Sequence, residues 1–382
     1  MNGNVINGPL SGILVADFTL VISGPSCTQL LCDNGARVIK FEQPEVGDIT
    51  RHCGVFVDKT LSKDFAAFNG GKESVEADLK NPDHLKMVKN IIRKADVLVE
   101  NFRPGVMKRL GLGYEEVVMI NPKIVYASIS GFGQDGPISD KPAYDEIVQA
   151  DSGFMSITGF PGQRATRAGI SLGDVNAGIH CYAAIMTALY ARATTGEGCH
   201  VDTAMLDSMI DLLAESVGEY FATNVTPQKL GNDNPSVTPF SSFATKDNEI
   251  VICVASGSLW KTLLKVIGKE DWLNRPEFRF PEEVHKNREL FRQELEKVLA
   301  EQEANYWLDR MHEAGLPCSR INTIAEMTEM EQVKARKMII TSGNGRFSGN
   351  PIKLSTYPAI EERRRAPEIG EHNEKIRKEF GE

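Results

Sequence analysis

Asp174 is the carboxylate with the most suggestive surroundings in this sequence. It follows Ser171-Leu172-Gly173 and precedes a long stretch of apolar and small residues, which predicts that it stands at the N-terminus of a helix. A carboxylate there can bind the free N–H groups of the helix and is stabilised as an anion by the helix dipole. Two interpretations follow: a simple helix cap, or a carboxylate nucleophile beside which Gly173 would let a large ligand approach the backbone.

A second group of residues could bind a phosphorylated ligand. It contains the basic side chains of Lys72, Lys80 and Arg109 and the run Asn101-Phe102-Arg103 at the end of a predicted strand. In open parallel sheets, ligands bind beyond the carboxyl ends of the strands. Each single cation could equally be a solvated surface charge.

Other patterns lack the spacing that their chemistry needs. The glycine pairs at 343–345 and 111–113 do not join a strand to a helix as a dinucleotide-binding loop does. Cys199 and His200 are neighbours on a predicted strand, so they point to opposite faces and cannot converge as a nucleophile and its base. The 7 cysteines and 7 histidines are scattered, so we expect reduced thiols and no metal site.

The overall composition is typical of a folded globular enzyme or binding protein. The chain has 382 residues, of which 41% are hydrophobic, and a formal net charge of −9. A net acidic chain lacks the basic face that nucleic-acid binding needs. The N-terminus has no signal-peptide pattern, and no apolar run reaches the roughly eighteen residues of a membrane span. We therefore expect a cytoplasmic protein that binds neither nucleic acid nor membrane.

Short strands alternate with helices through the first half of the chain. The strands are predicted at 13–19, 37–42, 74–79, 97–102, 124–132 and 199–205. This alternation indicates βαβ units and a mostly parallel sheet of the α/β class. The helix after Asp174, at 175–192, is apolar on every face, as is typical of a helix buried in a large core or an interface. A composition rich in Asn, Pro, Gly and Thr near 224–239 indicates a linker, and about 150 residues per domain predicts two domains.

The ordered motifs resemble the class III CoA-transferases over nearly the whole chain. They include DFT (17–19), GP (24–25), GARVIK (35–40), GD (47–48), TR (50–51), DLK (78–80), ADVLVENF (95–102), GFGQDGP (131–137) and GD (173–174). The resemblance implies a Rossmann-like large domain built from both chain ends, an inserted smaller α+β domain, and two subunits interlocked as a homodimer. The expected boundaries are 1–205 for the first part of the large domain, 206–240 for the linker, 241–324 for the small domain and 325–382 for the return to the large domain.

The resemblance implies that Asp174 is the nucleophile. Asp174 would attack an acyl-CoA donor, and CoA would pass through an aspartyl-CoA thioester to a small acceptor carboxylate. CoA is then a substrate, and no cofactor or metal is implied. The residues that the resemblance places against CoA or the reacting groups are Ile22, Ser23, Ala77, Asp78, Leu79, Lys80, Asn101, Phe102, Arg103, Arg109, Tyr144 and Gly173.

This chain departs from the formyl-CoA:oxalate branch of that family. A glutamine of that branch is replaced by Ile22, so backbone N–H groups must stabilise the oxyanion instead. The segment 255–260 replaces a Gly-rich loop, and Gln43 replaces an arginine near the adenine. The residues at 28–32 and 42–44 look closer to the acetyl-CoA:oxalate branch. We therefore expect oxalate or another short carboxylate as the acceptor.

Two alternatives remain open. Acyl-CoA racemases of the same fold use a histidine where this chain has Tyr144, and a phenol with a free pKa near 10 is a poor base at neutral pH. A non-catalytic CoA-binding subunit would keep Asn101 and Arg109 but would have no use for an ionised Asp174.

Overall fold

The computed structural model describes residues 8–58 and 61–381, which form two compact units. The first unit lies within Met1–Met155, Arg167–Val225 and Glu331–Glu382, and the second within Ser156–Thr166 and Thr226–Met330. The residues 206–225, which were expected in a linker, form helices of the first unit, and the short segment Ser156–Thr166 joins the second unit. No helix of the described chain has the length and apolar character that crossing a membrane requires.

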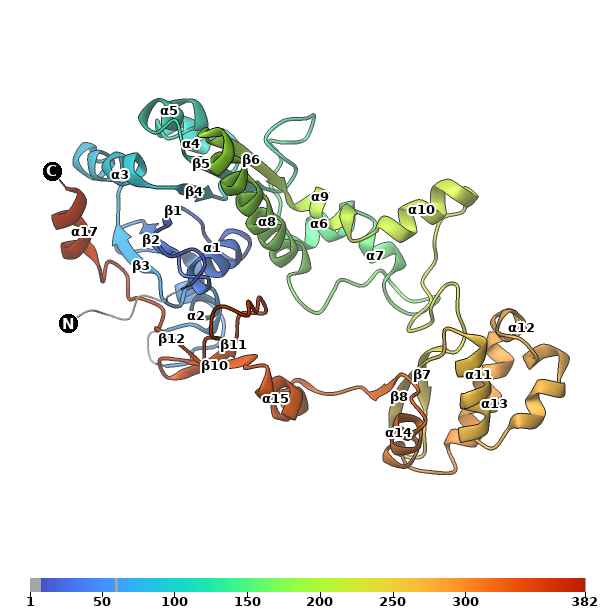
Figure 1. The fold of residues 1–382 in the computed structure, drawn as a ribbon. Coiled ribbons are helices and arrows are strands. Elements are labelled where there is room, and N and C mark those ends of the chain that lie inside the picture. Colours follow the sequence, from blue (N-terminus) through green and yellow to red (C-terminus); the bar gives the residue numbers. More distant parts are fainter. Residues whose placement is uncertain (1–7, 59–60, 382) are drawn as a thin grey trace. The chain divides into compact units, whose positions relative to one another are not determined.

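A six-stranded parallel sheet forms the centre of the first unit, as the alternation of strands and helices predicts (Figure 1). Its strands are β1 (Leu14–Asp17), β2 (Arg37–Glu42), β3 (Glu73–Glu76), β4 (Val97–Glu100), β5 (Val125–Ser130) and β6 (Cys199–Ala204). Their order is β3-β2-β1-β4-β5-β6, so the connections change direction between β1 and β4. In such sheets, the carboxyl ends of the two central strands open a crevice for ligands.

Helices cover both faces of this sheet, and its strands β4 and β5 are accordingly buried along their whole length. Along β4, Val97 and Val99 face one core while Leu98 faces the other. The first core includes α1 (Ser23–Asp33), α8 (Leu172–Thr195) and α9 (Met205–Asp211). The second includes α3 (Pro82–Lys94), α4 (Val106–Arg109), α5 (Tyr114–Ile120) and α17 (Asn373–Phe380).

Helix α8 packs closely against α1 at Gly178. A Cβ atom at this position would lie 1.9 Å from Ser26 Oγ and 2.6 Å from Ser23 O, so the contact requires glycine. The buried face of α8 carries small residues such as Ala177 and Cys181, whereas Tyr190 is 76% exposed. Within the single chain, α8 is therefore buried along one face only.

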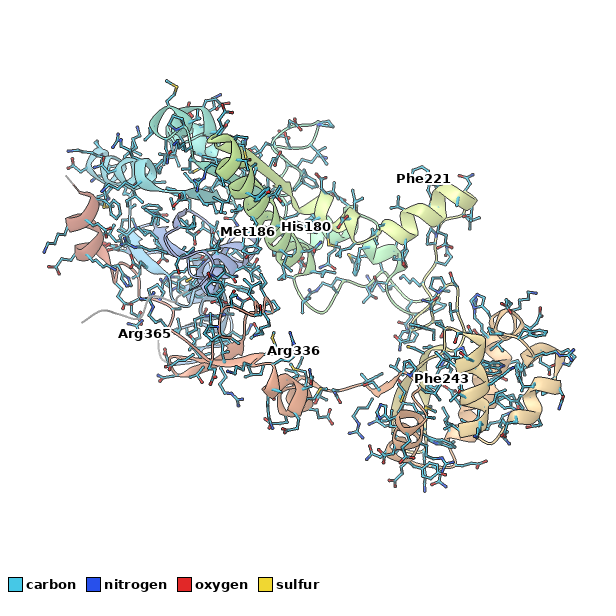
Figure 2. The ribbon with its side chains drawn as sticks, in the orientation of Figure 1. His180, Met186, Phe221, Phe243, Arg336 and Arg365 are labelled. Atoms are coloured by element: carbon cyan, nitrogen blue, oxygen red, sulfur yellow. The ribbon has the colours of Figure 1, made fainter. Side chains whose placement is uncertain are left out.

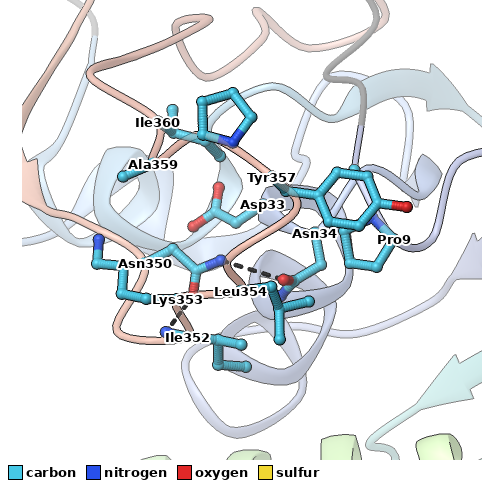
Figure 3. A pocket seen from close by; sticks show the side chains of 12 residues that line it. Pro9, Asp33, Asn34, Asn350, Ile352, Lys353, Leu354, Tyr357, Ala359 and Ile360 are labelled. Atoms are coloured by element: carbon cyan, nitrogen blue, oxygen red, sulfur yellow. Dashed lines mark hydrogen bonds between the residues drawn. The ribbon is translucent and has the colours of Figure 1, made fainter.

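The C-terminal segment returns to the first unit and packs beside its N-terminal strands. Strands β10 (Ile339–Ser342), β11 (Gly345–Ser348) and β12 (Glu362–Arg363) form a small mixed sheet. Arg363 Nε donates to Asp33 Oδ1 at 2.8 Å, and both side chains are buried. Beside this pair, residues from both ends of the chain enclose a hollow of about 30 Å³, in which Asn350 donates to Asn34 (Figure 3). A hollow of this size holds a water molecule and no larger ligand.

The second unit is a small α+β fold. Its antiparallel sheet contains β7 (Phe240–Ala244), β8 (Glu249–Cys253) and β9 (Cys318–Arg320). Its helices are α11 (Gly257–Val266), η2 (Glu270–Asn274), η3 (Pro276–Phe278), α12 (Pro281–Lys286), α13 (Arg288–Leu299), α14 (Ala304–Glu313) and α15 (Ile324–Glu329). Aromatic contacts join its core, with Trp260 and Phe291 at 5.5 Å between ring centroids.

The remaining helices are short. They are η1 (Ile49–His52), α2 (Lys63–Asn69), α6 (Asp145–Asp151), α7 (Phe154–Ile157), α10 (Ala214–Thr223) and α16 (Glu331–Ala335).

Candidate active site

The segment 18–23 connects β1 to α1 at the carboxyl end of β1, which pairs with β4. The side-chain amide of Asn101, which follows β4, accepts one hydrogen bond from the backbone of this segment and donates another to it. Leu20 N donates to Asn101 Oδ1 at 2.8 Å, and Asn101 Nδ2 donates to Leu20 O at 2.8 Å and to Ser23 Oγ at 3.1 Å. Asn101 was predicted to contact CoA, and in this structure its amide anchors the segment that carries Ile22 and Ser23.

Ser23 links this anchor to Asp174. Ser23 is the first residue of α1, Asp174 lies in the first turn of α8, and the Ser23 hydroxyl is near enough to the Asp174 carboxyl to lower its pKa. The amide of Asn101 donates to Ser23 Oγ, so the single hydroxyl proton of Ser23 remains available to a carboxylate that approaches it. The close packing at Gly178 brings the two helix N-termini together and so makes this contact possible.

The surroundings of Asp174 oppose its ionisation. Burial raises the pKa of Asp174 to about 7, and the negative charges of Asp145 and Glu146 act in the same direction, while the hydrogen bond from Ser23 lowers it. We expected the helix N-terminus to keep this carboxylate ionised. A pKa of about 7 instead leaves a large fraction of the side chain protonated at neutral pH.

Asp145 is a site residue that our sequence analysis missed. Its carboxylate is buried and accepts a hydrogen bond from Gly173 N at 2.7 Å and another from Gln149 Nε2 at 2.6 Å. A Cβ atom at Gly173 would lie 2.7 Å from Val148 Cγ2, so this glycine serves the packing of α6 against α8. Nothing in the spacing of two residues 28 positions apart indicates this contact.

The other residues predicted to bind CoA lie along the same edge of the sheet. Ala77–Lys80 follow β3, Phe102 and Arg103 follow β4, Arg109 ends α4, and Tyr144 precedes α6 with 74% of its surface exposed. Lys80 and Arg109 are exposed and, within the described residues, form no ion pair. The strand β3 is two strands away from β1, a separation of about 10 Å at the usual strand spacing. Ile22, Ser23, Asn101, Gly173 and Asp174 therefore form one cluster, and Ala77–Lys80 lies apart from it.

Comparison with known proteins identifies the family. The family model described as CoA-transferase family III matches residues 10–373. This chain belongs to that family. Its curated relatives include an acetyl-CoA:oxalate CoA-transferase from Acetobacter aceti, 44% identical over 98% of this chain and 96% of its own length, and a human succinyl-CoA:glutarate CoA-transferase, 32% identical over 97% and 86%. A solved structure of a CaiB/BaiF family protein from Brucella suis matches with a TM-score of 0.89 at 32% identity, covering 98% of this chain and 100% of the other. The resemblance stated from the sequence motifs is thus confirmed, and the protein is a CoA-transferase.

Lys72 does not bind substrate phosphates in this CoA-transferase, contrary to one sequence interpretation. The side chain is buried, and its Nζ lies 3.1 Å from Asp17 Oδ2, 2.7 Å from Thr28 Oγ1 and 2.9 Å from Asn69 Oδ1. Its charge compensates the fully buried carboxylate of Asp17 at the end of β1. Lys72 therefore stabilises the end of β1 from within the protein and is inaccessible to a ligand.

The histidine of the Cys199-His200 pair has structural contacts in this CoA-transferase. His200 stacks on Tyr114, with 5.0 Å between ring centroids, and its Nε2 lies 3.0 Å from Ser128 Oγ. Nowhere in the described residues do three or more His, Cys, Asp or Glu side chains gather as metal ligands would.

Proposed function

We propose that this CoA-transferase moves CoA from an acyl-CoA to a small carboxylate, with Asp174 as the nucleophile. The observation that carries the proposal is the half-buried Asp174 carboxylate, which lies near the Ser23 hydroxyl at the start of the helix that follows β1. The Acetobacter aceti relative, named for acetyl-CoA and oxalate, favours oxalate or another short carboxylate as the acceptor.

The reaction proceeds by four exchanges at carbonyl carbons. Ionised Asp174 attacks the thioester carbonyl of the donor, and the C–S bond breaks. CoA leaves as a thiolate, and the donor acyl group and Asp174 are then joined in a mixed anhydride. The thiolate attacks the Asp174 carbonyl and releases the donor acid, which leaves an aspartyl-CoA thioester. The acceptor carboxylate displaces the thiolate from Asp174, and the thiolate then attacks the acceptor carbonyl and regenerates the Asp174 carboxylate.

Backbone N–H groups at the start of α1 stabilise the oxyanions of these steps. Ile22 has no amide to donate, but the first-turn N–H groups of a helix have no intrahelical acceptor. Within the described residues, no acceptor is recorded for the N–H groups of Ser23 and Gly24. Such fixed donors contribute strongly to transition-state stabilisation.

CoA binding is assigned to the edge of the sheet on either side of this cluster. Ala77–Lys80, Phe102, Arg103 and Tyr144 supply the surface, and the unpaired cations of Lys80 and Arg109 supply charge for the phosphates. Binding energy from this distant part of CoA holds the thioester against Asp174. We assign no cofactor and no metal to the reaction.

We further propose that two subunits form an interlocked homodimer, with a Rossmann-like large domain and an inserted small domain in each, in the cytoplasm. Apolar residues exposed on α8 and α10 support an interface there. Ile179, Tyr190 and Phe221 are 49%, 76% and 79% exposed, and Figure 2 shows Phe221 on α10.

Light scattering during size-exclusion chromatography should give about twice the monomer mass, and a monomer at micromolar concentration would reject the assembly.

The nucleophile is tested by intact-protein mass spectrometry after mixing with acetyl-CoA or succinyl-CoA and trapping with hydroxylamine or borohydride. We expect a covalent product on Asp174 in the wild-type protein and none in Asp174→Ala, whose CoA binding should persist. Transfer of CoA to oxalate and other short acids is then screened. Unimpaired turnover by Asp174→Ala would reject the mechanism, and exchange of the α-proton of an acyl-CoA with deuterated solvent, without transfer, would indicate a racemase.

A further inference from the structure

Val21 has a strained backbone next to the proposed nucleophile. Among the described residues, four other than glycine have a positive φ, and Val21, at +67°, is the β-branched one. A branched side chain makes this left-handed conformation unfavourable, so the surrounding structure must hold it. Val21 lies directly before Ile22 and Ser23, so its φ angle sets the direction in which these residues leave β1.

Asp48 binds the backbone of Val21 from a fully buried position. Val21 N lies 3.3 Å from Asp48 Oδ1 and 3.2 Å from Asp48 Oδ2. The carboxylate is itself fixed, because Thr50 N and Thr50 Oγ1 donate to Oδ1 and Lys40 Nζ lies 3.1 Å from Oδ2. A buried N–H group without an acceptor is costly, so this carboxylate gives the strained conformation a strong advantage.

Val21 is the residue of the segment 18–23 whose backbone Asp48 binds, and its neighbours have other partners. Lys40 Nζ donates to Thr19 O at 2.6 Å, and Asn101 pairs with both backbone groups of Leu20. Lys40 also contacts Asp48, but Leu20, directly before Val21, is held by Asn101 and not by Asp48, whereas α1 begins after Ile22 and follows the turn at Val21. Asp48 therefore acts on the φ angle of Val21, which lies between the end of β1 and the helix α1 that begins with Ser23.

We propose that Asp48 is a positioning residue for this transferase: by binding the Val21 N–H, it holds Val21 in the left-handed region and directs Ser23 and the first N–H groups of α1 toward Asp174. This inference rests on the proposed role of Asp174 as the nucleophile. Asp48 does not touch the reacting atoms, and its effect passes through the backbone of Val21.

The test compares the rate of Asp174 acylation in single-turnover experiments for the wild type, Asp48→Asn, Val21→Gly and the double variant. We expect Asp48→Asn to slow acylation about tenfold or more, with KM for the acyl-CoA changed by less than about threefold, because misplacement of the site affects chemistry more than remote binding. Glycine adopts positive φ without steric cost, so Val21→Gly should restore the rate of Asp48→Asn by about threefold or more.

If Asp48 had a purely structural role, Val21→Gly would not restore the acylation rate of Asp48→Asn. The matched control is Glu73→Gln, which also removes a buried carboxylate of the same sheet but one that binds Arg37 and Lys375; it should lower stability without slowing acylation. If Asp48→Asn does not fold, Val21→Pro tests the same point with the Asp48 network intact, since proline has no N–H and a φ near −65°. Wild-type acylation rates in Val21→Pro, or a double variant no faster than Asp48→Asn, would overturn this inference alone. A wild-type protein without acylation of Asp174 would overturn the proposed function as well.

Discussion

Two neighbours of Asp174 act on its charge in opposite directions. The Asp145 carboxylate raises the pKa of Asp174, whereas the Ser23 hydroxyl lowers it. Burial raises the pKa of Asp174 more than Asp145 does, and the result is a pKa of about 7. A nucleophile has to be ionised, so the balance between these two neighbours determines how much of the enzyme can react at a given pH.

Substitution of these neighbours should move the pH profile in opposite directions. We expect kcat/KM of the wild type to fall below about pH 7, where Asp174 becomes protonated. Asp145→Asn keeps an oxygen for Gly173 N but removes the charge, so the fall should move to lower pH. Ser23→Ala removes a hydrogen bond to the ionised form, so the fall should move to higher pH and the rate at pH 7 should drop about three- to tenfold.

The control for this pair is Ser26→Ala, which removes a hydroxyl one turn further along α1 that donates to Ser23 O and not to Asp174. Its pH profile should match that of the wild type. A shift in the same direction for Asp145→Asn and Ser23→Ala would contradict the opposed action of the two neighbours.

At the scale of elements, the position of Asp174 depends on how closely α8 approaches α1. Gly178→Ala places a methyl group 1.9 Å from Ser26 Oγ and 2.6 Å from Ser23 O, so the helices must move apart. Overpacking of this kind costs about 1–3 kcal/mol of the free energy of unfolding. Because the movement separates Ser23 from Asp174, we also expect a loss of transfer activity of about tenfold or more. Urea denaturation and steady-state assays measure the two effects.

Gly218→Ala on α10 is the matched control, because a Cβ there meets no atom within 4 Å. Alanine is the better helix former, so this variant should be as stable as the wild type or slightly more stable. Equal stability of Gly178→Ala and Gly218→Ala would show that the approach of α8 to α1 is not limited by the glycine.

The strands could be predicted from the sequence because their signal is local. Short segments rich in β-branched and aromatic residues between helical stretches, such as β2 and β5, identify a parallel α/β sheet without knowledge of its neighbours. The contact of Gly178 with α1 and the contact of Asp145 with Gly173 join residues far apart in the sequence, and no local pattern reports them. Asp174 was identified because a helix start and the family motif coincide there, whereas the strain at Val21 is visible only in the backbone angles. The helices α9 and α10 were missed because their apolar residues are partly exposed and resemble those of a linker.

At the scale of the whole molecule, a buried ion pair joins the two ends of the chain. Arg363 pairs with Asp33 across 330 positions of sequence, and both side chains are 3% exposed. Burial raises the pKa of Asp33, and the positive charge of Arg363 opposes that rise. Arg363→Met leaves this carboxylate buried without its cation, so we expect the free energy of unfolding to fall by about 3–5 kcal/mol.

The control is Lys63→Met, which removes a surface lysine paired with Asp64 and should cost less than about 1 kcal/mol. Denaturant unfolding followed by circular dichroism measures both variants. A loss as small for Arg363→Met as for Lys63→Met would mean that the ion pair contributes nothing beyond a surface contact.

The return of the C-terminal segment has a consequence for synthesis on the ribosome. Ile376 and Phe380 of α17 belong to the same core as Ile39 and Val75, which are translated some 300 residues earlier by the difference in residue number. A nascent chain that has emerged only as far as β6 therefore carries an uncovered apolar surface on β3 and α3, the elements that α17 covers in Figure 1. The second unit, most of which is the continuous stretch Thr226–Met330, needs nothing from the last 50 residues of the chain and can fold while they are still being added. Translation of α17 thus completes this core of the first unit.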